Sequence, residues 1–215
     1  MENLKALTEA VCCVAGHFLK EERKSFRREV VQEKHAHDYV SYVDKASEKK
    51  VVSALRKLLP EAGFIAEEGS AAYSDETYCW VVDPLDGTTN YIHDNAPYCV
   101  SIALRDKQSL LLGVVYEPCR DECFYAWKGG GAYVNGERLR VSLVSEPKDA
   151  FVVTELPYNF EQYARTGEHL IHELYGKVAG IRMNGSAALA LCYVAAGRFD
   201  AWLEAFIGKW DFSAA

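Results

Sequence analysis

Residues 80–90 place the strongest constraint on the fold of this 215-residue chain. They read Trp-Val-Val-Asp-Pro-Leu-Asp-Gly-Thr-Thr-Asn, an apolar run that predicts a buried strand and is followed directly by two aspartates. Pro84 fixes one backbone angle between these aspartates, so both carboxylates can face one point. Gly87 lets the backbone approach closely, and Thr88 begins a predicted helix whose free N–H groups suit a phosphate. The fold must therefore bring a strand end, a turn and a helix start together.

Other acidic residues stand at the ends or starts of predicted elements. They are Asp44, Glu67 and Asp211. Asp44 is predicted to be the N-cap of a helix that follows it. The Leu85 carbonyl lies between Asp83 and Asp86 and offers a further oxygen. Hard oxygen donors without neighbouring His or Cys are typical of Mg²⁺ or Mn²⁺ sites rather than zinc sites.

Composition excludes several classes of protein. The net charge of −7 argues against a general nucleic-acid binder, which normally has a basic surface. No secretory signal opens the sequence, and no apolar run is long enough to span a bilayer. The seven cysteines contain no CxxC pair, as is typical of a reduced protein with buried thiols. We therefore predict a cytoplasmic protein that binds neither nucleic acid nor membrane.

The order of elements predicts stacked layers of helix and sheet. Helical periodicity marks the N-terminus and the segment after Asp44, and the charged residues 21–38 are expected to form a loop or a strand pair. Short strands then form an antiparallel meander with a tight turn at Asn135-Gly136, between strands at 132–134 and 139–141. Strand and helix alternate afterwards: 151–154, about 160–175, near 181, 186–196 and 200–204. A weak division near residue 145 separates an N-terminal part, 1–145, from an incomplete C-terminal α/β part, 146–215.

The sequence resembles the inositol monophosphatase family in these motifs. Residues 80–93 resemble the first family signature, and residues 210–215 resemble the second. Residues 64–68 and 129–136 are similar to the family's glutamate segment and Gly-rich hairpin, and the resemblance covers residues 1–215. It implies an αβαβα sandwich of the inositol monophosphatase and fructose-1,6-bisphosphatase type, C-terminally short. It also implies a homodimeric phosphatase that depends on Mg²⁺ and is inhibited by lithium.

The resemblance also implies a set of metal ligands. Two or three Mg²⁺ ions are expected, with Mn²⁺ as a possible substitute. The first ion would be held by Glu67, Asp83 and the Leu85 carbonyl. The second would be held by Asp83, Asp86 and Asp211, and Glu67 would also contact a third, weaker ion.

Further roles follow from the same resemblance. Thr88 and Asp44 match a pair that polarises the attacking water, with Glu67 nearby. Gly87 and Thr88 would hold the phosphate through backbone N–H groups. Contacts with the polyol hydroxyls are implied for four residues: Gly185, Ser186, Ala187 and Glu204.

The predicted substrate is inositol monophosphate or a similar polyol or sugar phosphate. The alternatives are a nucleotide 3′-phosphatase or fructose-bisphosphatase of the same superfamily, and a catalytically weak interaction protein with this fold. Thr89-Asn90-Tyr91 favours inositol monophosphate or a similar polyol phosphate over these alternatives. Pro157-Tyr158 stands where many relatives have Gly-Ser, so a serine that contacts substrate is absent. The sequence stops at Ala215 within the second signature, and we expect Asp211 to be mobile and the second ion to bind weakly.

Overall fold

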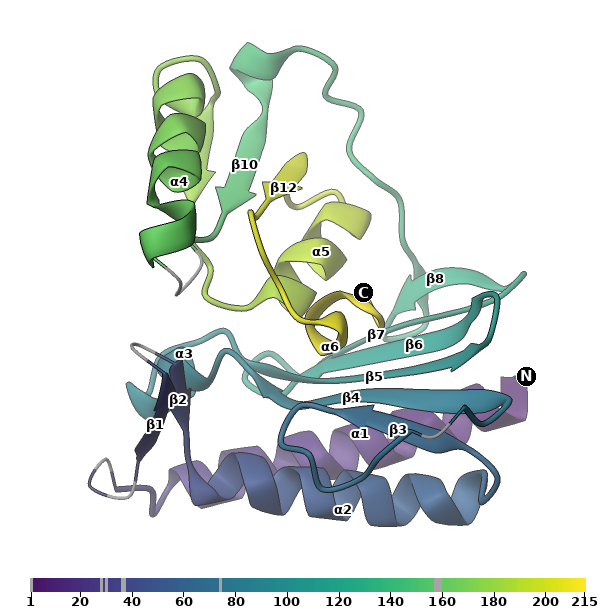
Figure 1. The fold of residues 1–215 in the computed structure, drawn as a ribbon. Coiled ribbons are helices and arrows are strands. Elements are labelled where there is room, and N and C mark those ends of the chain that lie inside the picture. Colours follow the sequence, from purple (N-terminus) through teal and green to yellow (C-terminus); the bar gives the residue numbers. More distant parts are fainter. Residues whose placement is uncertain (1, 28, 30, 36–37, 74, 157–159) are drawn as a thin grey trace.

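The computed structural model describes residues 2–27, 29, 31–35, 38–73, 75–156 and 160–215. Five layers of helix and sheet stack on one another (Figure 1). Helices α1 (Glu2–Arg23) and α2 (Tyr42–Leu58) cover one face of a seven-stranded sheet, and α5 (Ala187–Ala195) and α6 (Lys209–Phe212) lie on its other face. A three-stranded sheet follows, with α4 (Phe160–Leu174) as the outer layer. This arrangement confirms the predicted αβαβα fold class.

The large sheet has the strand order β3-β4-β5-β6-β7-β8-β9. Its strands are β3 (Gly63–Ala66), β4 (Tyr78–Asp86), β5 (Cys99–Asp106), β6 (Leu110–Glu117), β7 (Glu122–Trp127), β8 (Gly131–Val134) and β9 (Glu137–Arg138). The strands from β4 onward pair antiparallel, as the predicted meander requires. However, β3 pairs parallel with β4, which the prediction of a simple meander missed. Parallel pairing puts the carboxyl ends of β3 and β4 at the same edge of the sheet.

The small sheet is entirely parallel, with the order β11-β10-β12. Its strands are β10 (Phe151–Thr154), β11 (Gly180–Arg182) and β12 (Ala201–Leu203), and the short helix η2 (Pro147–Asp149) precedes them. The remaining elements are the antiparallel pair β1 (Gln32–His35) and β2 (Asp38–Val40), and α3 (Thr88–Ile92). The pair β1–β2 agrees with the strand-pair alternative for residues 21–38, of which residues 28, 30, 36 and 37 lie outside the described part.

One strand of the predicted hairpin is misplaced. The strand after the Asn135-Gly136 turn is β9, at Glu137–Arg138, and not residues 139–141. The chain leaves the sheet after Arg138 and passes Gly197, whose Cβ position would lie 3.0 Å from the Arg140 carbonyl oxygen. Gly197 therefore permits this close approach of two backbone segments.

Two buried clusters hold the layers together. One joins α1 and α2 to the large sheet and includes the fully buried Trp80. The other joins the large sheet to α5, through residues such as Val115 and Leu189. No helix in the described part of the chain is long and apolar enough to cross a membrane. The division near residue 145 stays a prediction.

Candidate active site

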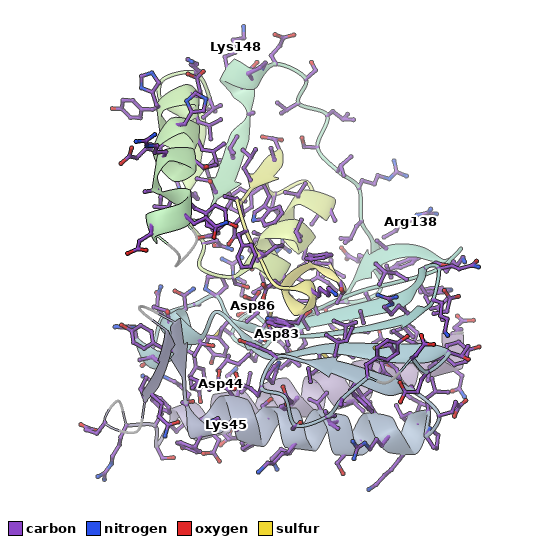
Figure 2. All side chains as sticks on the ribbon, in the orientation of Figure 1. Asp44, Lys45, Asp83, Asp86, Arg138 and Lys148 are labelled. Atoms are coloured by element: carbon purple, nitrogen blue, oxygen red, sulfur yellow. The ribbon has the colours of Figure 1, made fainter. Side chains whose placement is uncertain are left out.

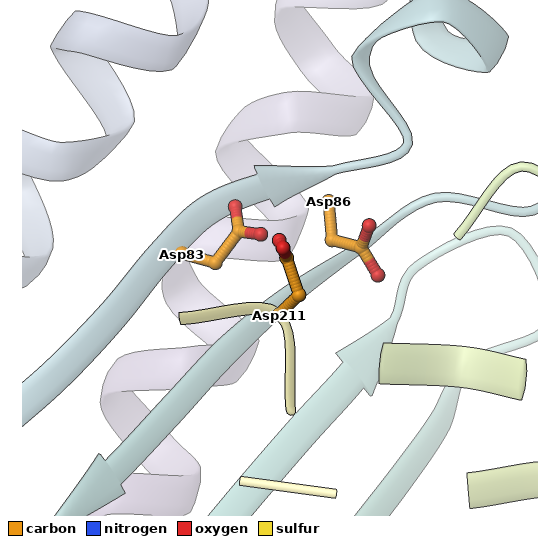
Figure 3. Close-up of side chains that lie close together, drawn as sticks. All are labelled: Asp83, Asp86 and Asp211. Carbon is orange, nitrogen blue, oxygen red and sulfur yellow. The ribbon is translucent and has the colours of Figure 1, made fainter. Parts of the chain in front are cut away.

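Three carboxylates converge between the large sheet and α6. Asp83 and Asp86 lie on the end of β4, and Asp211 lies in α6. One oxygen of each comes within 4.8 Å of the others (Figure 3). Figure 2 shows Asp83 and Asp86 beneath the upper layers, with Asp44 near the start of α2. Residues 128 positions apart in the sequence, Asp83 and Asp211, thus lie close together.

The end of β4 is shaped so that both of its aspartates face this point. The pairing of β4 with β5 is irregular between Asp83 and Asp86. Asp83 accepts a hydrogen bond from the Leu85 N–H at 3.0 Å, and the buried Ser47 hydroxyl donates to the Pro84 carbonyl at 3.0 Å. These bonds and the fixed angle of proline stiffen the turn.

Glu67 reaches the same edge because β3 runs parallel to β4. Ala66 pairs with Val82, and the Glu67 N–H donates to the Val82 carbonyl at 3.2 Å. The buried Glu48 of α2 then accepts hydrogen bonds from the N–H groups of Glu68 and Ser70, at 2.6 and 2.7 Å. This buried carboxylate fixes the loop that carries Glu67.

Asp44 lies at the start of α2, but it is not the N-cap that we predicted. The N-cap is Ser41, whose hydroxyl accepts the Val43 N–H at 3.1 Å, while Asp44 accepts the Ser41 N–H at 2.8 Å. This capping box satisfies two helix-end donors at once, so the serine three residues earlier is the better cap. The second Asp44 oxygen lies 3.0 Å from the Thr88 hydroxyl, which is also 2.9 Å from the Leu85 carbonyl.

Asp86 links the large sheet to the next layer. It accepts hydrogen bonds from the Ser186 hydroxyl at 2.6 Å and from the Ala188 N–H at 2.8 Å. Ser186 is the N-cap of α5, so the carboxylate lies against the positive end of that helix. The turn before α5 is thereby fixed against the metal-ligand candidates.

Asp211 is held by short-range and long-range contacts. Its carboxylate accepts the Gly208 N–H at 2.6 Å, and the Ser101 hydroxyl donates to the neighbouring Trp210 carbonyl at 3.3 Å. A Cβ on Gly113 of β6 would lie 2.2 Å from the Ala214 carbonyl oxygen, so the segment after α6 packs directly on the sheet. The expected mobility of Asp211 stays a prediction.

These groups surround a cavity of about 140 Å³. Its lining includes every predicted site residue except Asp44, which contacts it through Thr88. Six of the residues that line it are acidic: Glu67, Asp83, Asp86, Glu155, Glu204 and Asp211. No Lys, Arg or His is among the described residues that line it.

Burial and mutual repulsion act on these carboxylates together. Burial, followed by the charges of Glu67, Asp86 and Asp211, raises the pKa of Asp83 well above its usual range. Burial also raises the pKa of Asp86, although hydrogen bonds from Ser186 and Ala188 oppose the rise. Burial raises the pKa of Glu204 to about 8. A concentration of uncompensated carboxylate oxygens is the donor set of a hard divalent cation, so these residues fit a bound metal.

Sequence reasoning missed some residues of the cavity. They are Tyr39, Thr89, Glu155, Leu156 and Ile207. Glu155 carried a usable signal, because it follows the buried strand β10 as Glu67 follows β3. Tyr39 and Ile207 carried none, since their places depend on how distant segments pack. Pro157 and Tyr158, the departure from the family pattern, lie outside the described residues.

The fold and the acidic cavity together define a layered protein of mixed helix and sheet with a carboxylate cluster suited to metal ions. A model of the inositol monophosphatase family matches residues 1–215, and the chain belongs to that family. This membership confirms the predicted resemblance and the predicted assignment as a phosphatase.

Individual relatives agree with this membership. The chain is 42% identical over 183 residues to the Nus factor SuhB of Escherichia coli, an alignment that covers 85% of this chain and 68% of that protein. It is 36% identical over 217 residues to a fructose-1,6-bisphosphatase/inositol-1-monophosphatase of Aquifex aeolicus, covering 100% of this chain and 82% of the relative. The crystal structure of the extragenic suppressor protein suhB from Bartonella henselae superposes with a TM-score of 0.91 at 35% identity. That match covers 97% of this chain and 81% of the other.

Proposed function

We propose that this protein is a metal-dependent phosphomonoester hydrolase that acts on inositol monophosphate or a similar polyol or sugar phosphate. The observation that carries the proposal is the cavity beside the Gly87-Thr88 turn, whose lining among the described residues includes six acidic and no basic side chains. A phosphate dianion would be repelled from such a cavity unless cations were bound there. Family membership supports the same conclusion.

The cations are proposed to be two or three Mg²⁺ ions, for which Mn²⁺ can substitute. The first ion would be held by Glu67, Asp83 and the Leu85 carbonyl. The second ion would be held by Asp83, Asp86 and Asp211. The mutual distances of Asp83, Asp86 and Asp211, all within 4.8 Å, support the second set. When bound, such ions neutralise phosphate charge and make a bound water more acidic.

Asp44 and Thr88 are proposed to orient the attacking water. The Thr88 hydroxyl has one proton and two nearby acceptors, the Asp44 carboxylate and the Leu85 carbonyl. If the Thr88 hydroxyl donates its hydrogen bond to the ionised Asp44, a lone pair of the Thr88 oxygen remains free to accept a hydrogen bond from the attacking water. Burial raises the pKa of Asp44, and the hydrogen bonds that it accepts from the Ser41 N–H at 2.8 Å and the Ser41 hydroxyl at 2.7 Å oppose that rise. Glu67 lines the cavity beside this pair and completes the proposed catalytic set.

The phosphate and the polyol are proposed to contact different residues of the cavity. The N–H groups of Gly87 and Thr88 would bind phosphate oxygens at the start of α3. Gly185, Ser186, Ala187 and Glu204 would contact the polyol hydroxyls. One Glu204 oxygen, Oε2, is buried and has no hydrogen-bond partner among the described residues, so it is an acceptor suited to a hydroxyl donor.

A hydrolysis panel tests the proposal. The purified protein should release phosphate from inositol 1-phosphate in Mg²⁺, should be inhibited by lithium, and should be inactive with chelator. Preferential hydrolysis of fructose 1,6-bisphosphate or of a nucleotide 3′-phosphate would reassign the substrate within the superfamily. Failure to hydrolyse any of them in Mg²⁺ or Mn²⁺ would refute the enzymatic proposal.

A second candidate is an interaction protein that keeps this fold with weak catalysis. This candidate is favoured by the name Nus factor, which the relatives from Escherichia coli and Pseudomonas aeruginosa carry. Absence of turnover with Mg²⁺ binding intact would support this candidate.

Assembly and location complete the proposal. We propose that the protein is a homodimer, and sedimentation velocity can test this. We also propose that it is located in the cytoplasm. All seven cysteines are free thiols, which supports a reducing compartment.

A further inference from the structure

The turn between β11 and α5 connects the small sheet to the cavity. Gly185, Ser186 and Ala187 of this turn line the cavity. Gly185 has a φ of +74°, in the left-handed region that favours glycine. A Cβ at this position would lie 2.7 Å from Nδ2 of Asn90, so the turn is also closely confined by its surroundings.

Two side chains from different layers bind the backbone of this turn. Asn90 of α3 donates from Nδ2 to the Asn184 carbonyl at 2.9 Å and to the Pro97 carbonyl at 2.8 Å. Glu155, directly after β10, accepts on Oε1 the N–H of Asn184 at 2.5 Å and that of Gly185 at 2.8 Å. The single peptide group between Asn184 and Gly185 is thus bound at its oxygen by Asn90 and at its nitrogen by Glu155.

We propose that Glu155 is a positioning residue for substrate binding, which fixes the Asn184–Gly185 peptide against Asn90 so that the turn presents its backbone to the phosphorylated substrate. This inference rests on the proposed function, since the turn is the proposed polyol-binding segment. Glu155 acts through the turn and not on the reacting atoms. Its role depends on an acceptor oxygen, because both of its bonds to the turn are accepted by the same atom.

The same turn is coupled to a metal-ligand candidate. Ser186 follows the bound peptide directly, and its hydroxyl donates to Asp86 at 2.6 Å. If the acceptor at Glu155 is removed, the N–H groups of Asn184 and Gly185 lose their partner and the turn is held from one side only. Hydrogen-bonding groups outside the ligand set that orient ligands commonly change affinity or activity by about 10–100-fold when they are mutated.

Two substitutions of Glu155 separate the loss of its hydrogen-bond acceptor from the loss of its negative charge. Glu155→Ala removes both, whereas Glu155→Gln keeps an acceptor oxygen and removes the charge. Asn90→Ala releases the other side of the peptide. Glu161→Ala, at an exposed position of α4, is the matched control for loss of one glutamate charge. The measurements are KM and kcat for inositol 1-phosphate in Mg²⁺, the Kd of inorganic phosphate in Mg²⁺ by calorimetry, and thermal unfolding.

We expect Glu155→Ala to raise KM and the phosphate Kd by about tenfold or more, with a smaller loss in kcat. Glu155→Gln should restore both constants to near the wild-type values, and Glu161→Ala should leave them unchanged. Unchanged constants in Glu155→Ala, or equal impairment in Glu155→Gln, would overturn the proposal.

The proposal can still be tested if the Glu155→Ala variant does not fold or if the wild-type protein is inactive. If Glu155→Ala does not fold, Asn90→Ala must raise KM and the phosphate Kd, and Glu155→Gln must not; any other result overturns the proposal. If the wild-type protein hydrolyses no phosphate ester, the proposed function fails separately. The phosphate Kd values then decide the role of Glu155 alone.

Discussion

The substitution Asp83→Asn removes one charge from the carboxylate cluster with little change in shape. The Asp83 side chain is 1% exposed, and one of its oxygens lies within 4.8 Å of oxygens of Asp86 and Asp211. Two unit charges 4.8 Å apart repel by about 3.5 kcal/mol at an effective dielectric constant of about 20. The amide oxygen of asparagine can still accept the Leu85 N–H, so the turn keeps its hydrogen bond.

Protonation relieves part of this repulsion in the ion-free protein, because the pKa of Asp83 is already raised by burial and by its neighbours. We therefore expect Asp83→Asn to raise the free energy of unfolding of the ion-free protein by about 2 kcal/mol, which is less than the repulsion energy of one full charge pair. For a chain of this size, that corresponds to a rise of about 4–8 °C in Tm. In Mg²⁺ the order should reverse. The wild-type protein is expected to gain about 2.7 kcal/mol at a concentration of about 100 times Kd, whereas the variant lacks the carboxylate that is proposed to be shared by both ions.

Thermal unfolding of both proteins, with chelator and with millimolar Mg²⁺, measures this reversal. Asp149→Asn, which removes the same charge at an exposed position in η2, is the control and should behave as the wild type in both conditions. The reasoning is refuted if Asp83→Asn lowers the ion-free Tm while Mg²⁺ raises the Tm of both proteins equally.

Three further predictions follow from the same geometry. His93→Ala should keep most of the hydrolytic activity because His93 is exposed; a loss equal to that of Asp83→Asn in folded protein would contradict this assignment. Gly87 has a φ of +90°, and its Cβ position lies 3.0 Å from the Gly185 carbonyl oxygen. Strain of about 1–2 kcal/mol should therefore make Gly87→Ala bind phosphate about tenfold more weakly by calorimetry, and an unchanged Kd would refute this. Burial raises the pKa of Glu204 from 4.5 to about 8, so the ion-free folded protein binds this proton more tightly than the unfolded chain. Ion-free Tm should fall as pH rises across that range, and Glu204→Gln should reduce the slope; equal slopes in both proteins would show that Glu204 is not responsible.

Local sequence was sufficient to predict the central part of the site. An apolar strand, a proline-stiffened turn and a glycine restrict the backbone so strongly that Asp83 and Asp86 have few other arrangements. Stacked layers of helix and sheet were also predictable from the order of periodic helices and short apolar strands, whereas the αβαβα order was implied only by the family resemblance. Asp211 could be associated with these residues only through the second family signature, since nothing local relates it to a strand 128 residues earlier.

The remaining features depend on tertiary contacts that local patterns do not encode. The parallel pairing of β3 with β4 could not be inferred, because apolar runs identify strands but not their direction. Ser41 and Asp44 are both good N-cap residues, and only the paired hydrogen bonds show that they form one capping box. Glu48 resembles any charged helix residue until distant backbone N–H groups are placed against it, and the position of Glu155 after an apolar strand does not indicate which N–H groups it binds.

The carboxylate cluster also determines where the ion-free protein should loosen first. Asp83 is fixed within a buried strand, and Asp86 is bound to α5 by two hydrogen bonds. Asp211 lies in a helix of four residues, too short to be stable by itself, so its place depends on packing against the sheet. Repulsion is therefore relieved at least cost by displacement of α6, and bound Mg²⁺ should oppose it. Hydrogen exchange of residues 208–213 should slow more on Mg²⁺ addition than exchange in β4, and equal protection of both segments would contradict this account.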